Sequence, residues 1–254
     1  MKRIMMPLAA TGAVALLAAC GNTPAPGTDA AGASGPSVVA ATTLSQADLG
    51  PKVQAALAKK GTFRVVSKTT GEDPGTLTAD VKLGGATPEF VVNADGTTVM
   101  GVGGRLYGQG EGISDGAQWV KYDAKKKGLD ALSGVVIQLI AWQAQPQQFL
   151  GATPYATKFT SAPGPDVDGV HTTLYDVTID LEKAAQAKAF GNFITAESLA
   201  QEKTKTLSAK VLLDGDSLPR KIDYTFGAEG GSSVFSKFGD SVIIAAPPID
   251  QVAK

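Results

Sequence analysis

The stretch Leu207–Phe226, with the sequence LSAKVLLDGDSLPRKIDYTF, indicates most clearly how this chain folds. Apolar side chains recur at nearly every second position in each half of it, with polar residues between them. This period of two is the pattern of a β-strand that has one covered face and one wet face. Between the halves, Asp214–Ser217 combines a glycine with two aspartates and predicts a turn. The stretch is therefore interpreted as a hairpin of two antiparallel strands.

The same alternation recurs elsewhere along the chain. In Thr76–Leu83, four apolar residues alternate with Thr, Asp and Lys. Asn93–Gly96 ends in Asp-Gly, which is a strong signal for a tight hairpin turn. The other predicted strands are Thr62–Lys68, Glu89–Val92, Thr97–Val102, Arg105–Tyr107, Gln118–Asp123, Tyr155–Ser161, Val170–Leu181, Ser232–Phe238 and Ser241–Ala245.

Four segments have a helical pattern instead. In Gly128–Leu150 the apolar residues recur every three or four positions, and Pro146 is expected to end or restart the helix. The other predicted helices are Leu44–Lys60, Glu182–Phe190 and Ala196–Glu202. Because strands follow strands in hairpins rather than alternating with helices, the sequence predicts an α+β domain, with a large curved antiparallel sheet and helices on one face.

The first residues of the chain have the pattern of an export signal. Lys2 and Arg3 form a short basic region, and the apolar stretch Ile4–Ala19 follows. As a helix this stretch would be about 24 Å long, which is shorter than the ~30 Å hydrocarbon core of a bilayer. We therefore interpret residues 1–19 as a signal peptide rather than a membrane span.

The signal ends in Leu-Ala-Ala-Cys, at residues 17–20, and this ending resembles a bacterial lipobox. The resemblance implies that the signal is removed before Cys20 and that Cys20 is joined to diacylglycerol and acylated. The protein would then be anchored by lipid on the extracytoplasmic face of the cell membrane. The alternative is an ordinary signal peptide, cut after a site such as residues 15–17, with a chance cysteine.

The segment that follows Cys20 is rich in Gly, Ala, Ser, Thr and Pro, up to about Thr43. This composition predicts a flexible tether with a reach of roughly 25–30 Å. Residues 20–43 are thus interpreted as lipidated cysteine and linker, and residues 44–254 as a single domain. Cys20 is the only cysteine, so the domain has no disulfide and no Cys nucleophile. The net charge of −1 and the lack of a basic patch indicate no nucleic-acid partner.

Several short motifs follow the lipobox and linker in a characteristic order. They are Thr62–Ser67, Arg105–Tyr107, Gln118–Asp123, Val167–Thr173, Leu218–Ile222, Phe238–Val242 and Ala246–Pro248. This order resembles the LppX/LprA/LprF/LprG family of actinobacterial lipoproteins, whose fold is similar to that of the LolA and LolB carriers. The resemblance implies a half-barrel antiparallel sheet that is wrapped over helices on its concave face. It also implies an apolar cavity that holds the acyl chains of lipids or glycolipids. The segment Gly128–Leu150 departs from the mycobacterial members, because it lacks their usual Leu-Asp-Pro start.

The alternation predicts which side chains would line such a cavity. Candidates from the strands are Leu77, Val81, Val211, Ile222, Tyr224 and Phe226, and candidates from the helix are Leu132, Val136, Leu139 and Ile140. The same residues are equally expected in a packed core, because any domain of a sheet and helices has such a stripe. The two predicted functions follow from these alternatives. One is a lipid carrier, and the other is a tethered interaction or scaffold module with a filled core and no lipid cargo.

Two motifs and the single histidine suggest other chemistry but are interpreted as structural. Gly112–Gly116 matches the Gly-x-Ser-x-Gly nucleophile elbow, and Asp166 or Asp168 with His171 would complete a triad around Ser114. A strand pattern follows this motif, whereas the elbow requires a helix there. His171 is in phase with Tyr175 and Val177. This predicts that it lies near the apolar face of the sheet, at the open end of the sheet, and that its role is structural. Asp166–Gly169 resembles part of a calcium loop without the final Glu ligand. No enzyme activity, metal or cofactor is predicted, and the donor or acceptor protein of a lipid carrier is unknown.

Overall fold

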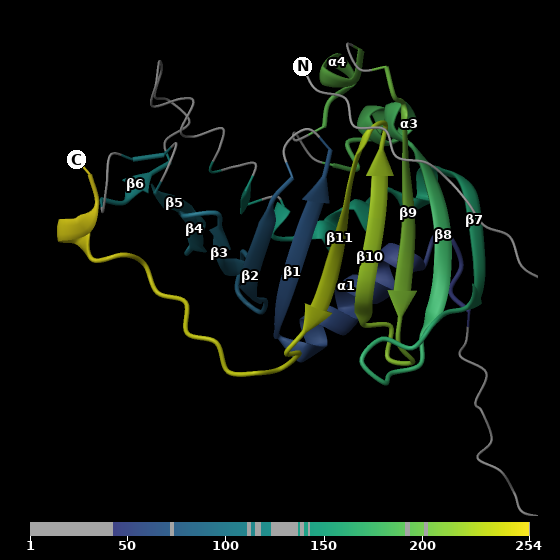
Figure 1. The fold of residues 1–254 in the computed structure, drawn as a ribbon, viewed down its shortest axis with the longest axis horizontal. Coiled ribbons are helices and arrows are strands. Elements are labelled where there is room, and N and C mark those ends of the chain that lie inside the picture. The colour runs from purple at the N-terminus through teal and green to yellow at the C-terminus, as the bar shows by residue number, and fades with distance from the viewer. Residues whose placement is uncertain are drawn as a thin grey trace, which may run out of the picture. The chain divides into compact units, whose positions relative to one another are not determined.

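One antiparallel sheet dominates the computed structural model of this protein (Figure 1), and the described residues contribute eleven strands to it. The structure describes residues 43–71, 74–110, 113–114, 118–122, 137, 140–141, 143–190, 194–200 and 203–253. The predicted signal peptide, Cys20 and almost all of the predicted tether lie outside these residues. The fold class predicted from the sequence, an antiparallel sheet with few helices, is confirmed.

The strands follow one another mostly as hairpins. Their bounds are β1 (Thr62–Thr70), β2 (Thr76–Lys82), β3 (Glu89–Ala94), β4 (Thr97–Val102), β5 (Arg105–Gly110), β6 (Val120–Lys121), β7 (Ala156–Pro163), β8 (Thr173–Asp180), β9 (Thr206–Leu213), β10 (Pro219–Phe226) and β11 (Glu229–Ser236). The order across the sheet is β6-β5-β4-β3-β2-β1-β11-β10-β9-β8-β7. Strand β11 lies between β1 and β10 and therefore joins the early strands of the chain to the late ones.

Tight turns explain why the hairpins form where the sequence predicts them. Asp95 and Gly96 connect β3 to β4 with φ values of 41° and 84°. Gly103 and Gly104 connect β4 to β5 with φ values of 56° and 73°. Two successive positive φ values give a turn whose twist matches that of the flanking strands. In the predicted hairpin of β9 and β10, the Asp214 carboxylate instead accepts hydrogen bonds from the backbone of the turn.

The described helical segments are α1 (Leu49–Lys60), η1 (Pro146–Tyr155), α3 (Leu181–Gln186), α4 (Ala196–Ala200) and η2 (Ile249–Gln251). Helix α1 begins five residues later than predicted, because the Ser45 hydroxyl and carbonyl accept hydrogen bonds from the Asp48 backbone and hold a separate turn. As predicted, Gly61 stops the helix after Lys60, and the φ value of Gly61 is 78°. Most of the predicted helix 128–150 lies outside the described residues. Pro146 starts a 3₁₀ helix, which confirms its predicted role as the point where the helix ends and restarts.

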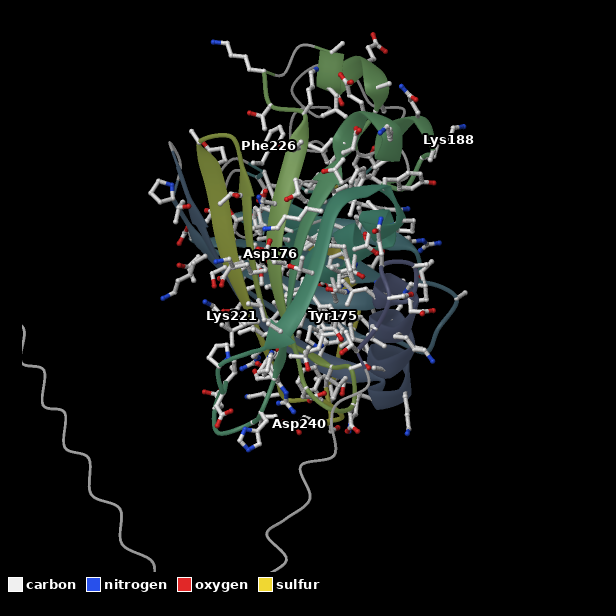
Figure 2. The ribbon with its side chains drawn as sticks, turned by 90° about the vertical axis from the view of Figure 1, so that its right-hand side faces the viewer. Tyr175, Asp176, Lys188, Lys221, Phe226 and Asp240 are labelled. Carbon is white, nitrogen blue, oxygen red and sulfur yellow. The ribbon has the colours of Figure 1, made fainter. Side chains whose placement is uncertain are left out.

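Side chains of the central strands divide between two faces. On the helix-covered face, a continuous row crosses β2, β1, β11, β10, β9 and β8, and each residue is the register partner of the next. This buried row consists of Leu77, Ser67, Ser233, Ile222, Val211 and Tyr175. Leu49, Val53 and Leu57 of α1 are fully buried in the same hydrophobic cluster. The opposite face, called here the open face, carries charged residues such as Asp176 and Lys221 (Figure 2).

The end of the chain does not form the predicted strand at Ser241–Ala245. Residues 240–248 have no regular structure, and the chain runs from the end of β11 to β6 (Figure 1). The reason is that both edges of β11 are already paired, one with β1 and one with β10. Near its end the chain instead forms a parallel bridge between Val252 and Trp119, next to the edge strand β6. Within residues 118–122, the described part of the predicted strand 118–123, the regular strand is β6.

Candidate functional site

The helix-covered face brings together three of the predicted lining residues. Leu77, Ile222 and Val211 belong to the buried row, and all three are buried. Val81 is also fully buried and lies opposite Phe63 on β1. Residues that are up to 145 positions apart in the sequence therefore share one apolar surface.

Tyr224 and Phe226 lie further along β10 than Ile222 and are only half-buried. Figure 2 shows Phe226 toward α3 and α4, whereas Tyr175 lies at the end of the sheet that α1 covers. Tyr224 lies over Gly231 of β11, where a Cβ would come within 2.6 Å of its hydroxyl oxygen. Burial, together with the negative charge of Glu229, raises the pKa of Tyr224. The α3 end of the face is thus more open than the α1 end.

The predicted helical lining is described only in part. Ile140 is half-buried and packs against the hydrophobic cluster. Leu132, Val136 and Leu139 lie outside the described residues. Ile137, which the sequence analysis did not select, is fully buried and packs over β5, where a Cβ on Gly108 would lie 2.6 Å from its Cγ1. The spacing of Ile137, Ile140 and Ala144 at intervals of three and four residues could have identified this face.

A polar pair interrupts the buried row. The hydroxyls of Ser67 and Ser233 are 2.8 Å apart and share a hydrogen bond across β1 and β11. Ser233 is fully buried and Ser67 nearly so. Because each hydroxyl is satisfied by the other, the pair fits within the apolar face without a further partner.

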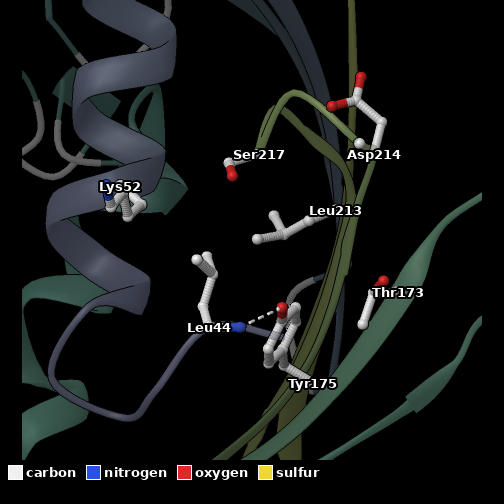
Figure 3. Close-up of a pocket in the computed structure, with 8 residues that line it drawn as sticks. Leu44, Lys52, Thr173, Tyr175, Leu213, Asp214 and Ser217 are labelled. Atoms are coloured by element: carbon white, nitrogen blue, oxygen red, sulfur yellow. Dashed lines mark hydrogen bonds between the residues drawn. The ribbon is translucent and has the colours of Figure 1, made fainter. Parts of the chain in front are cut away.

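A small cleft opens between α1 and the adjacent ends of β8 and β9 (Figure 3). Its volume is about 250 Å³, and it is lined by Leu44, Lys52, Thr173, Tyr175, Leu213, Asp214, Gly215 and Ser217. The backbone N–H of Leu44 donates to the Tyr175 hydroxyl at 3.0 Å. The Asp214 carboxylate is held by Arg220 at 2.7 Å. The cleft therefore lies where the predicted domain begins, beside the first residues that follow the predicted tether.

Ser114 and His171, from the possible hydrolase triad, lie beside strands that are far apart in the strand order. The Ser114 hydroxyl accepts a hydrogen bond from the Gly110 backbone in the loop after β5, and Gly112 and Gly116 lie outside the described residues. His171 precedes β8, which is nine places from β6 and next to last in the strand order. The predicted position of His171 near the apolar face is wrong, because its side chain is 96% exposed. The strand begins only at Thr173, so the alternation does not extend back to His171.

The motif Asp166–Gly169 forms a turn, as predicted. Val167 and Val170 bridge each other, and Asp168 and Gly169 between them have positive φ values of 50° and 75°. The His171 Nδ1 lies 2.7 Å from the Asp166 carboxylate. This loop is held by local hydrogen bonds and stands apart from the buried row.

None of the helices within the described residues is long and apolar enough to cross a membrane.

No protein-family model matches the sequence. It also matches no curated protein. Among solved structures, the lipoprotein LppX of Mycobacterium tuberculosis is similar with a TM-score of 0.48 and 16% identity, over 79% of this chain and 100% of LppX. LprF of Mycobacterium bovis is similar with a TM-score of 0.49 and 14% identity, over 80% of this chain and 96% of LprF. At these identities, the similarity to LppX and LprF concerns the fold alone.

Proposed function

We propose that this protein is a lipid-anchored lipoprotein of the cell envelope that binds a lipid or lipoglycan by its acyl chains, for transport or presentation. The ligand would lie between the sheet and the helices that cover it. Cys20 would carry the anchor, the segment up to Thr43 would be the tether, and residues 44–254 would be a single binding domain. We assign no catalytic role to the domain.

The observation that carries the proposal is the length of the buried row. The row crosses six neighbouring strands, and a spacing of about 4.8 Å between strands makes it roughly 24 Å long. One leaflet of a bilayer has a hydrocarbon depth of about 15 Å, half of the ~30 Å core. The row is therefore longer than an acyl chain of membrane length. The Ser67–Ser233 pair is the only polar interruption among the six described residues of the row.

The free-energy cost of exposing acyl chains to water explains why a lipid needs such an apolar surface. Exposing each CH₂ to water costs about 0.8 kcal/mol, so a chain of sixteen carbons costs roughly 13 kcal/mol to expose. A lipid that leaves a membrane needs an apolar shelter of matching size. A tether of roughly 25–30 Å would keep this shelter close to the membrane that supplies the lipid.

In this structure the row is packed against its cover, since Val211 and Ile222 are fully buried. A bound chain would have to displace part of the cover, so binding would select a state in which the helical layer and the sheet are further apart. The same complete burial favours the second candidate, a tethered interaction module with a filled core. The two candidates differ in whether the purified protein contains lipid.

The test is native mass spectrometry of the full-length protein, purified from the membrane of a lipoprotein-exporting bacterium and transferred to amphipol. We expect a mass larger than that of the acylated chain by one or more lipids. A protein that carries no lipid beyond its own anchor, even after incubation with vesicles of the host's lipids, would contradict lipid carriage and support the interaction module.

A matched pair of variants assigns the lipid to the helix-covered face. Val211→Phe adds volume to the buried row, whereas Lys210→Phe adds the same side chain to the exposed position beside it on β9. We expect the first variant to lose bound lipid and the second to retain it. Thermal unfolding measured on both variants separates a blocked site from an unfolded protein. Equal lipid content in the two folded variants would place the ligand elsewhere.

A further inference from the structure

One buried polar group lacks the partner that its environment demands. Gln147, in the first turn of η1, is only 1% exposed. Its side-chain oxygen, Oε1, is buried and accepts no hydrogen bond from any group of the described residues. Buried polar atoms are hydrogen-bonded in the large majority of cases, and an exception requires an explanation.

Several contacts hold the helix η1, which carries Gln147, in its place. Gln46 Nε2, from the segment before α1, donates to the carbonyl oxygens of Pro154 and Ala156, each at 3.1 Å. The Thr153 hydroxyl lies 3.0 Å from the Gln46 carbonyl oxygen and donates to it. A Cβ on Gly50 of α1 would collide with the carbonyl oxygen of Leu150, so the two backbones are in close contact. The C-terminal part of η1 is therefore docked against α1 and the segment that precedes it.

Gln147 lies in a buried part of the chain. Ala144 and Leu150, three residues before and after it, are fully buried, and Gln145 and Phe149 are nearly so. η1 packs against α1 and also contacts β8, β10 and α3, so it belongs to the cover of the buried row. A partner for Oε1 must therefore be a small polar group attached to an apolar body, or a single water molecule.

The chemistry of the amide restricts this partner further. The oxygen of an amide only accepts hydrogen bonds, so its partner must carry an O–H or an N–H. Alkyl chains, ester groups and ionised carboxylates have no such donor. A lipid with a free hydroxyl or an amide near its acyl chains has one.

We propose that Gln147 selects lipids that carry a hydrogen-bond donor close to their acyl chains, and that its Oε1 accepts this hydrogen bond in the complex. The inference rests on the proposed lipid binding and adds the class of lipid to it. Lipids in which every hydroxyl is esterified, and free fatty acids in their ionised form, leave Oε1 unpaired and bind less tightly.

The test compares two lipids that differ in one donor. Dipalmitoylglycerol has a free hydroxyl, and its 3-O-methyl ether has the same chains with the hydroxyl capped. Binding of each is measured by native mass spectrometry on the full-length protein in amphipol, with the two lipids in competition. We expect the free hydroxyl to be preferred roughly threefold to tenfold, the effect of one net hydrogen bond.

Two variants attribute this preference to Gln147. Gln147→Met keeps the length and volume of the side chain but removes the acceptor, and we expect it to bind both lipids equally. Its melting temperature without lipid is measured alongside, to separate the loss of the acceptor from a loss of folding. Gln46→Met is the matched control, since it removes a glutamine of the same layer that is already paired. We expect this control to lower the melting temperature and to keep the preference for the free hydroxyl.

Each outcome separates this inference from the proposed function. Equal binding of the two lipids by the unsubstituted protein would contradict the inference and leave lipid carriage intact, with a water molecule as the partner of Oε1. A preference that survives in Gln147→Met would contradict the inference, because a group other than Gln147 would then bind the lipid hydroxyl. Failure of both lipids to bind would contradict the inference and, together with a lipid-free mass of the purified protein, the proposed function as well.

Discussion

Ile222 and Asp223 are neighbours on β10, yet they belong to two different environments. Ile222 lies in the buried row and is fully buried, whereas Asp223 lies on the open face and forms an ion pair with Lys221 at 2.9 Å. Both residues belong to the same strand, in which successive side chains point to opposite faces of the sheet. Burial of apolar side chains on one face therefore holds this sheet to its cover, while the other face carries charged side chains that are partly exposed to solvent.

Charged pairs on the open face follow a common pattern. Arg64 lies opposite Asp80 on β2, and its guanidinium contacts the carboxylate at 2.6 Å. The hydrogen bond to Asp80 raises the pKa of Arg64. Lys158 of β7 and Asp176 of β8 form a similar pair at 2.7 Å. Such cross-strand pairs favour the correct register, but each contributes little to stability because water screens it.

The largest expected difference between the faces comes from truncating the neighbours on β10. Ile222→Ala should lower the free energy of unfolding by about 2–5 kcal/mol, because it removes buried methyl groups and leaves a cavity. Asp223→Ala should change it by no more than about 0.5 kcal/mol. Urea unfolding followed by circular dichroism measures both. Similar losses for the two variants would mean that the open face is covered in the folded protein.

A second prediction concerns the serine pair within the buried row. Ser233→Ala leaves the buried Ser67 hydroxyl without its partner and should cost about 1–3 kcal/mol. The double variant with Ser67→Ala should cost less than the sum of the two single variants, because no hydroxyl is then left unpaired. A double-mutant cycle in urea measures this coupling. Strict additivity would indicate that each serine has another partner.

A third prediction concerns Asp180, the last residue of β8, whose side chain lies on the open face. The Asp180 side chain caps α3 by accepting a hydrogen bond from the Lys183 backbone at 3.1 Å, and this bond lowers the pKa of Asp180. Asp180→Ala should cost about 1 kcal/mol. A lowered pKa means that the charged form stabilises the folded state at neutral pH, and that this stability is lost as the pH falls through the lowered pKa. The melting temperatures of the protein and the variant should therefore converge in strong acid, and a constant gap would contradict this role.

The smallest expected effect comes from a charge on the open face. Lys158→Ala removes the ion pair with Asp176 and should cost about 0.2–1 kcal/mol in low salt. The difference should shrink at 1 M salt, where the screening length is about 3 Å. Melting temperatures at two salt concentrations measure it. A loss that does not depend on salt would point to packing of the lysine stem rather than to charge.

Local sequence patterns determined most of the elements of this fold. Alternation located β2, β9 and β10, because a strand with one covered face must place apolar residues at every second position. Turn chemistry located the hairpin at Asp95 and Gly96, because few residues adopt the positive φ values that it requires. Pro146 marked the start of η1, because proline cannot donate the backbone hydrogen bond of a continuing helix.

Only the tertiary structure decided what depends on partners that are distant in the chain. Ser241–Ala245 has the composition of a strand but finds no free edge beside β11, because β1 and β10 already pair with β11. The pairing of Ser67 with Ser233, across 166 positions, and the missing partner of Gln147 are equally invisible in any local window. The sequence by itself thus determined most of the segments that form strands and the face that each of them buries. Strand order, edge pairing and the satisfaction of buried polar groups depended on contacts between segments far apart in the chain, which no local period encodes.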